Sequence, residues 1–122
     1  MEYSIEIEGD IVIINLSGNF VRNTGEELEA KVSELAGKGF RYLLIDMSNV
    51  HLIDSYGVTV CITFYKMIEN MDGLLFFIKP SQAVEKVFRI THADQKFHIV
   101  NDKNKGIKSI QEKIRKTLED NK

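Results

Sequence analysis

Short apolar runs alternate along this chain with segments whose apolar residues recur every three or four positions, and this alternation restricts the possible folds most. Strands are predicted over 3–7, 11–16, 42–46, 74–78 and 97–100, and helices over 24–37, 55–70, 82–90 and 107–118. The order ββαβαβαβα predicts an α/β domain with right-handed crossovers and a mostly parallel central sheet. The first two strands, separated by Gly9-Asp10, are expected to form an antiparallel hairpin at one edge.

The ends of the helices carry local signals. Thr24 is predicted to be the N-cap of the first helix, with Glu27 completing a capping box. The segment Ser55–Asn70 contains many β-branched residues that suit a strand, but sixteen residues without a turn signal favour a helix. Because this helix is apolar nearly all round, it is expected to be buried or to keep a second face for a partner.

Length, charge and cysteine content exclude several classes of protein. The chain has 122 residues, which fits a single domain over residues 1–122, and its formal net charge of −2 argues against nucleic acid as a direct partner. One cysteine, Cys61, allows no internal disulfide and suits a reducing compartment. The acidic N-terminus differs from a signal peptide, and no apolar run is long enough to span a membrane. We therefore expect a cytoplasmic domain.

Catalytic and metal chemistry have little support. His51, His92 and His98 are scattered without the spacing of a metal pair, and Cys61 lies among apolar neighbours where a thiol is usually inert. Residues 101–122 carry seven basic and four acidic side chains. This excess fits the solvated face of a last helix, although it is also compatible with an acidic partner.

The segment Asp54-Ser55-Tyr56-Gly57 directly precedes or opens the long apolar helix. In a purely structural interpretation, Asp54 or Ser55 caps the helix and Gly57 allows close packing in its first turn. In a functional interpretation, Ser55 presents a hydroxyl at an exposed helix N-terminus, where an added phosphate is tolerated by the fold. The two interpretations are compatible.

The chain resembles the STAS domain family, in particular the bacterial anti-sigma factor antagonists. The resemblance is carried by Leu44-Ile45-Asp46-Met47-Ser48, by Val50, Ile53 and Asp54-Ser55-x-Gly57, and by Leu16-Ser17-Gly18 and Glu26-Glu27-Leu28 in the preceding strand and helix. It covers nearly the whole chain. It implies a STAS-like α/β fold.

The resemblance also implies a function. Unmodified members bind an anti-sigma factor that is also a serine kinase, and so free a sigma factor for transcription. That kinase would phosphorylate Ser55, and a PP2C-type phosphatase would reverse the change. ATP belongs to the kinase, so no cofactor is expected here.

Further site residues follow from the same resemblance. Asp54 would fix the loop, Asp46 would lie near it, and Gly57 would let the helix start approach the partner. The residues expected around the docking surface are Asn23, Thr24, Tyr56, Thr59 and Ser81.

The sequence departs from the family pattern at two places, and two other functions compete. Asn19-Phe20-Val21-Arg22 stands where many members have an acidic residue, and Tyr56 replaces a small Ser or Thr. One alternative is a STAS scaffold subunit of a stressosome-like or lipid-transport complex that is not phosphorylated. The other is a small α/β enzyme that uses Asp46 and Asp54 as paired carboxylates at the carboxyl edge of the sheet.

Overall fold

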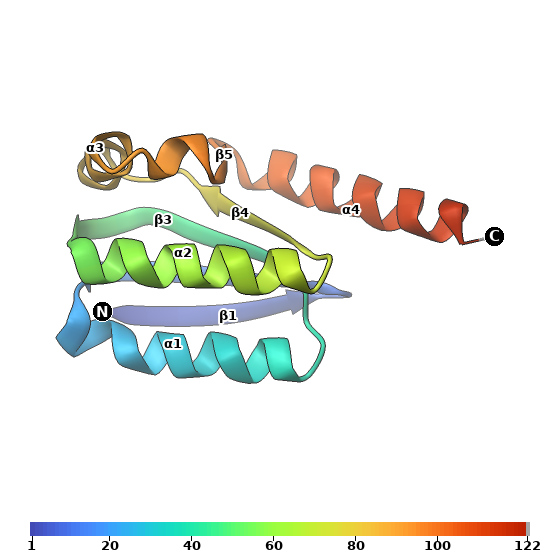
Figure 1. The fold of residues 1–122 in the computed structure, drawn as a ribbon, viewed down its shortest axis with the longest axis horizontal. Coiled ribbons are helices and arrows are strands. Elements are labelled where there is room, and N and C mark those ends of the chain that lie inside the picture. The colour runs from blue at the N-terminus through green and yellow to red at the C-terminus, as the bar shows by residue number, and fades with distance from the viewer. Residues whose placement is uncertain (122) are drawn as a thin grey trace.

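The protein folds around one mixed sheet with helices on both faces, as seen in a computed structural model that describes residues 1–121 (Figure 1). The strands are β1 (Glu2–Glu8), β2 (Ile11–Phe20), β3 (Tyr42–Ile53), β4 (Leu74–Ile78) and β5 (His98–Val100). The helices are α1 (Arg22–Gly37), α2 (Ser55–Asn70), α3 (Gln82–Ile90) and α4 (Lys103–Asp120), with a short 3-10 turn at Ala93–Gln95. The predicted order of strands and helices is confirmed.

The five strands lie in the sheet in the order in which they occur in the chain. β1 and β2 form the antiparallel hairpin predicted at one edge, and β2, β3, β4 and β5 are parallel. Because parallel neighbours start at the same end, each helix that follows β2 or β3 begins at the same edge of the sheet.

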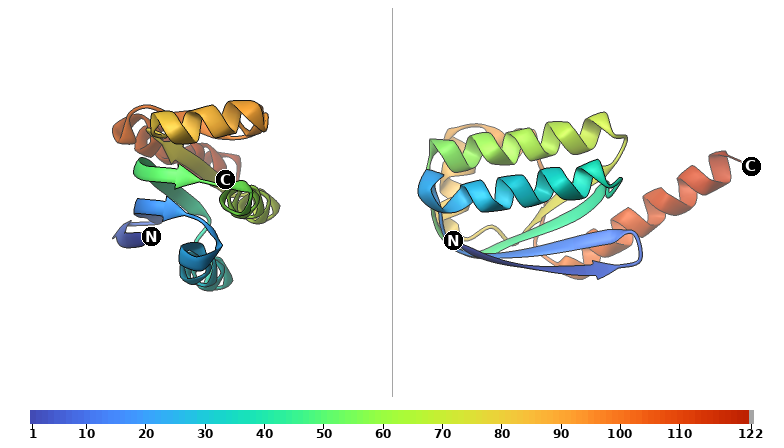
Figure 2. Two further views of the ribbon diagram at one scale, coloured as in Figure 1. Left: turned by 90° about the vertical axis from the view of Figure 1, so that its left-hand side faces the viewer. Right: turned by 90° about the horizontal axis from the view of Figure 1, so that it is seen from below.

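Two apolar layers hold the helices against the sheet. On one face, Leu28 of α1, Phe64 of α2 and Phe88 of α3 pack against the sheet in one buried cluster. On the other face, Ile110 of α4 packs against a smaller cluster that includes Leu44. Figure 2 shows α1 and α2 together on one side, while α4 crosses the opposite side and extends beyond it.

β2 and β3 are longer than their apolar runs suggest. The strands predicted to end at Leu16 and Asp46 continue to Phe20 and Ile53. Register shifts near Ser17 and Gly18 let the two backbones keep pairing while polar residues interrupt the apolar pattern. The prediction that Asp46 ends a strand is therefore wrong, and the carboxyl end of β3 lies at Ile53.

The predicted bounds hold for α2, but the predicted start of α1 is wrong. The bounds Ser55–Asn70 are confirmed. The helix α2 buries one apolar face, a second apolar stripe is half-buried (Ile62, Tyr65 and Met67), and Thr59, Thr63 and Lys66 are exposed. The prediction of Thr24 as an N-cap is wrong, because α1 already begins at Arg22 and Val21 is its N-cap. Within residues 1–121, no helix combines the length and apolarity that crossing a membrane requires.

Candidate functional site

The N-termini of α1 and α2 lie side by side at one edge of the sheet. Phe20 at the end of β2 is the register partner of Ile53 at the end of β3, and each helix starts two residues later, at Arg22 and Ser55. Figure 1 shows both helices starting at the same end and running in the same direction. We call residues 22–25 and 54–59 the α1–α2 edge.

Asp54 is the N-cap of α2, and Ser55 is the first helical residue. The Asp54 carboxylate accepts a hydrogen bond of 3.1 Å from the backbone N–H of Gly57. The Thr59 hydroxyl donates 2.8 Å to the carbonyl oxygen of Ser55. Both contacts fix the backbone on either side of the Ser55 side chain, which is itself exposed.

Gly57 is buried against its own domain. A Cβ atom at this position would lie 2.5 Å from the carbonyl oxygen of Phe20 and 2.6 Å from Cγ1 of Ile53. The missing side chain therefore lets α2 approach the ends of β2 and β3. The space that Gly57 leaves is thus filled from within the domain, and the expectation that it brings the helix start close to a partner stays a prediction.

Tyr56 lies across α1. Its hydroxyl donates a hydrogen bond of 2.8 Å to Oε1 of Glu29, and its ring packs where a Cβ on Gly25 would come within 2.9 Å. The guanidinium carbon of Arg22 lies 4.8 Å from the centre of the ring. Burial, together with the negative charge and hydrogen bond of Glu29, raises the pKa of Tyr56 to about 12.

Thr24 and Ser81 hold loops in place. The Thr24 hydroxyl donates to the carbonyl oxygens of Asn19 and Val21. The Ser81 hydroxyl donates a hydrogen bond of 2.6 Å to the carbonyl oxygen of Val50 and accepts one from the N–H of Val84, so it caps α3. These two hydroxyls act inside the domain.

Asn23 differs from these hydroxyls in its exposure. It lies in the first turn of α1, and its side chain is open to solvent, as is that of Thr59 in α2. Asn23 and Thr59 are therefore accessible on the same edge as Ser55.

Asp46 lies away from this edge. Its carboxylate accepts hydrogen bonds of 2.9 and 2.7 Å from the backbone N–H and the hydroxyl of Ser48. Asp46 pairs in register with Asn15 and Ile78, and the seven residues from it to Ile53 span on the order of 20 Å at the usual strand rise. The prediction that Asp46 lies near Ser55 is wrong. This separation also contradicts the hypothesis of an enzyme with Asp46 and Asp54 as paired carboxylates.

The other groups singled out in the sequence do not join this site. Cys61 is buried in α2, and burial raises the pKa of its thiol, as expected of an inert cysteine. No group of three His, Cys, Asp or Glu side chains among residues 1–121 is placed to hold a metal ion.

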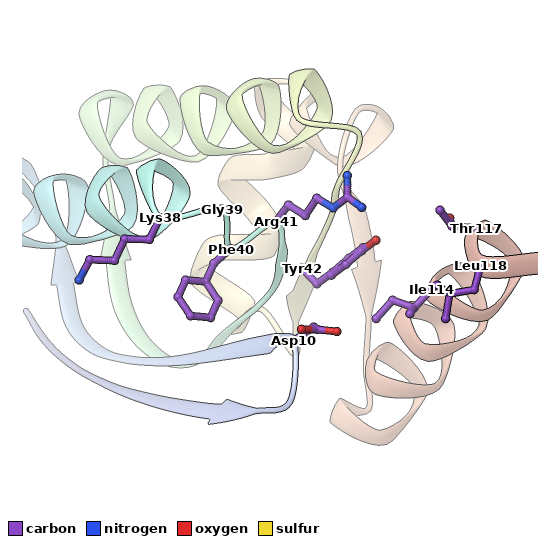
Figure 3. Close-up of a pocket in the computed structure, with 9 residues that line it drawn as sticks. All are labelled: Asp10, Lys38, Gly39, Phe40, Arg41, Tyr42, Ile114, Thr117 and Leu118. Atoms are coloured by element: carbon purple, nitrogen blue, oxygen red, sulfur yellow. The ribbon is translucent and has the colours of Figure 1, made fainter. Parts of the chain in front are cut away.

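A cavity of about 410 Å³ lies at the opposite end of the sheet, where β3 begins (Figure 3). Tyr42 of β3 and Ile114 and Leu118 of α4 line its apolar part, and Asp10 and Arg41 lie at its polar part. Leu118 is 63% exposed, so this hollow is an open notch beneath the projecting end of α4. It contains no residue of the α1–α2 edge.

Sequence reasoning missed Arg22, Gly25 and Glu29, the three residues of α1 that surround the Tyr56 ring. Tyr56 and Glu29 are 27 positions apart, so no local pattern joins them. The available signal was that Arg22, Gly25 and Glu29 are spaced by three and four residues and therefore share one face of α1.

The fold is found in several known proteins. A protein of Thermotoga neapolitana, provisionally named an anti-sigma factor antagonist, is 27% identical over 78 residues, which are 64% of this chain and 69% of that protein. The crystal structure of a Thermotoga maritima protein with the same provisional name superposes with a TM-score of 0.84 at 22% identity, covering 89% of this chain and 94% of that one.

A second solved structure, that of the anti-sigma factor antagonist SpoIIAA in its unphosphorylated form, has a TM-score of 0.71 at 19% identity and covers 93% of this chain and 98% of that one. SpoIIAA, a Bacillus cell fate determinant, has also been solved in its phosphorylated form, with a TM-score of 0.72 at 20% identity and coverage of 89% and 99%. The model of the STAS domain matches residues 2–106. Together with the five-stranded sheet, this match shows that the chain belongs to the STAS domain family.

Proposed function

We propose that this protein is an anti-sigma factor antagonist whose unphosphorylated form binds an anti-sigma factor that is also a serine kinase. Binding frees a sigma factor, and phosphorylation of Ser55 by the kinase ends the binding. A PP2C-type phosphatase restores the active form. The chain acts as a binding protein, the kinase supplies the ATP site, and the proposed partners place the switch in the cytoplasm.

The observation that carries the proposal is the exposed side chain of Ser55 on the first residue of α2, beside the capping carboxylate of Asp54. A kinase can reach this hydroxyl without unfolding the helix. The comparisons add support, because SpoIIAA shares the fold and exists in an unphosphorylated and a phosphorylated form.

Charge explains how one phosphate can change binding more than folding. A phosphoserine carries about −1.5 to −2 charges at neutral pH. At a helix N-terminus this charge is stabilised, by up to about 2 kcal/mol in favourable settings. In a complex, the same phosphate would lie beside Asp54 and lose its water to the partner surface. Contacts between like charges in an interface cost several kcal/mol. The exposed residues of the α1–α2 edge form the proposed contact surface, and they are Arg22, Asn23, Asp54, Ser55 and Thr59.

The proposal is tested by incubating the protein with its cognate kinase and ATP and mapping the modified residue by mass spectrometry. One phosphate on Ser55 is expected. Ser55→Ala should remain unmodified, whereas Ser33→Ala, which removes an exposed serine in the middle of α1, should be modified like the wild type.

Modification at another hydroxyl, with Ser55 unmodified, would remove the basis for the switch. The scaffold alternative makes a different prediction, namely that neither the kinase nor ATP changes the protein and that a STAS assembly or a transport complex is its partner.

A further inference from the structure

Arg22 and Ser55 are neighbours in space although 33 positions separate them in the sequence. Their strands end in the register pair Phe20 and Ile53, and neighbouring strands lie about 4.8 Å apart. Each of the two residues follows its strand end by two positions and opens its helix. The close approach of Gly57 to the carbonyl oxygen of Phe20 keeps the two helix starts together.

The side chain of Arg22 is directed toward α2. Its guanidinium carbon lies 4.8 Å from the ring centre of Tyr56, the residue that follows Ser55. The ring itself is held by the hydrogen bond to Glu29 and by its packing over Gly25. Arg22 is exposed. In this cation–π pair, the guanidinium of Arg22 can therefore move to another contact, whereas the Tyr56 ring is held in place.

Arg22 is the one cation in a group of acidic side chains. Residues 20–29 and 54–59 contain the carboxylates of Glu26, Glu27, Glu29 and Asp54, and Arg22 as their only basic residue. A phosphate on Ser55 adds about −1.5 to −2 charges at neutral pH next to Asp54. Guanidinium groups bind phosphate through paired, charge-assisted hydrogen bonds, which are stronger than an exposed contact with an aromatic ring.

We propose that Arg22 is the intramolecular partner of the phosphate on Ser55, and that its guanidinium leaves the Tyr56 ring to bind the phosphate oxygens. This inference deepens the proposed function and rests on it, because Ser55 must be phosphorylated for the exchange to occur. The exchange stabilises the modified form. It also removes Arg22 from the surface offered to a partner, so that one modification changes two charged positions of the α1–α2 edge.

The test uses protein with phosphoserine incorporated at position 55 during translation, which needs no kinase. The second pKa of the phosphoserine is measured by phosphorus NMR titration in the wild-type background and in Arg22→Gln, Arg22→Lys and Arg115→Gln. A nearby cation favours the dianion, so this pKa should be lower with Arg22 than in Arg22→Gln by roughly half a unit or more. Arg22→Lys should retain part of the shift.

The comparison isolates Arg22, because the acidic side chains of the α1–α2 region, Asp54, Glu26, Glu27 and Glu29, are the same in all variants. Arg115 is an exposed arginine of α4, and Arg115→Gln should titrate like the wild type. In the wild type, phosphorylation should also shift the NMR signals of the Tyr56 ring, and this shift should shrink in Arg22→Gln.

Equal second pKa values in the wild type and Arg22→Gln would overturn the inference. That result would leave the kinase assay for Ser55 standing. Conversely, a kinase that ignores Ser55 would refute the proposed function without changing this titration, so the two failures are distinguishable.

Discussion

The carbonyl oxygen of Phe20 lies 2.5 Å from the position that a Cβ atom on Gly57 would occupy. The first turn of α2 is therefore fitted directly against the end of β2. This contact joins the strand that leads into α1 to the turn that carries Ser55. It explains why the two helix starts form one surface.

Gly57→Ala should destabilise the fold, by about 1–3 kcal/mol, because the added methyl group overlaps backbone and the Ile53 side chain. Gly37→Ala is the matched control, since a Cβ there meets nothing within 4 Å. It should be neutral or stabilising by up to about 1 kcal/mol. Urea unfolding measures both. Equal stabilities for the two variants would contradict the close approach at Gly57.

Gly57→Leu is a larger substitution at the same position, and its effect should fall on folding. The larger side chain has no space beside Phe20 and Ile53. Gly57→Leu should therefore lower the stability of the free domain at least as much as Gly57→Ala does.

Asp54→Ala should cost about 0.5–2 kcal/mol, because it removes the acceptor for the Gly57 N–H at the start of α2. Asp54→Asn keeps an oxygen in the same place and should stay within a few tenths of a kcal/mol of the wild type. Thermal unfolding of the three proteins checks the order. If Asn is as destabilising as Ala, the negative charge and not the hydrogen bond is the source of the stabilisation.

Tyr56→Phe should lose about 0.5–1.5 kcal/mol at neutral pH, the usual value of one hydrogen bond, here the bond to Glu29. The pKa of Tyr56 is raised to about 12 in the folded protein, above about 10 for an unfolded tyrosine. The neutral phenol is thus favoured by folding, so this stabilisation is complete below pH 10 and is lost as the pH rises through 12.

Unfolding measured against pH should therefore show a loss of stability in this alkaline window that is smaller in Tyr56→Phe. Ultraviolet titration of tyrosinate gives a second readout. Glu29→Gln keeps an acceptor but removes the charge, and should bring the pKa of Tyr56 down toward its usual value. If Tyr56→Phe loses as much stability as the wild type over this alkaline range, the contact between Tyr56 and Glu29 is contradicted.

The sequence predicted the order of elements because each element has its own periodicity. The bounds of α2 followed from length alone, since sixteen residues without a turn are too many for a buried strand. The extension of β3 to Ile53 was not predictable in this way. Ser48, Asn49 and His51 break the apolar alternation, while pairing with β2 continues through the register shifts.

The candidate site was predictable only where it is local. Asp54 and Ser55 stand next to each other at a helix start, and the structure assigns the cap to Asp54. The prediction of Thr24 as a cap was wrong because Thr24 lies inside the first turn of α1 and not before it. From that position its hydroxyl bonds back to the carbonyl oxygen of Val21. The contact of Tyr56 with Glu29 depends on how α1 and α2 pack, which no local pattern specifies.

The measurement that tests the central claim most directly is paired calorimetry of melting and of kinase binding, on the unmodified protein, Ser55→Ala and the protein phosphorylated at Ser55. Ser55→Ala should stay folded and bind like the unmodified protein, and Ser55→Asp should fold but bind weakly. Phosphorylation should leave the domain folded, with a melting temperature no lower than that of the unmodified protein, and weaken binding by about a hundredfold or more, or roughly 3 kcal/mol. If phosphorylation unfolds the domain, or leaves the kinase affinity within about a factor of two, Ser55 is not the switch.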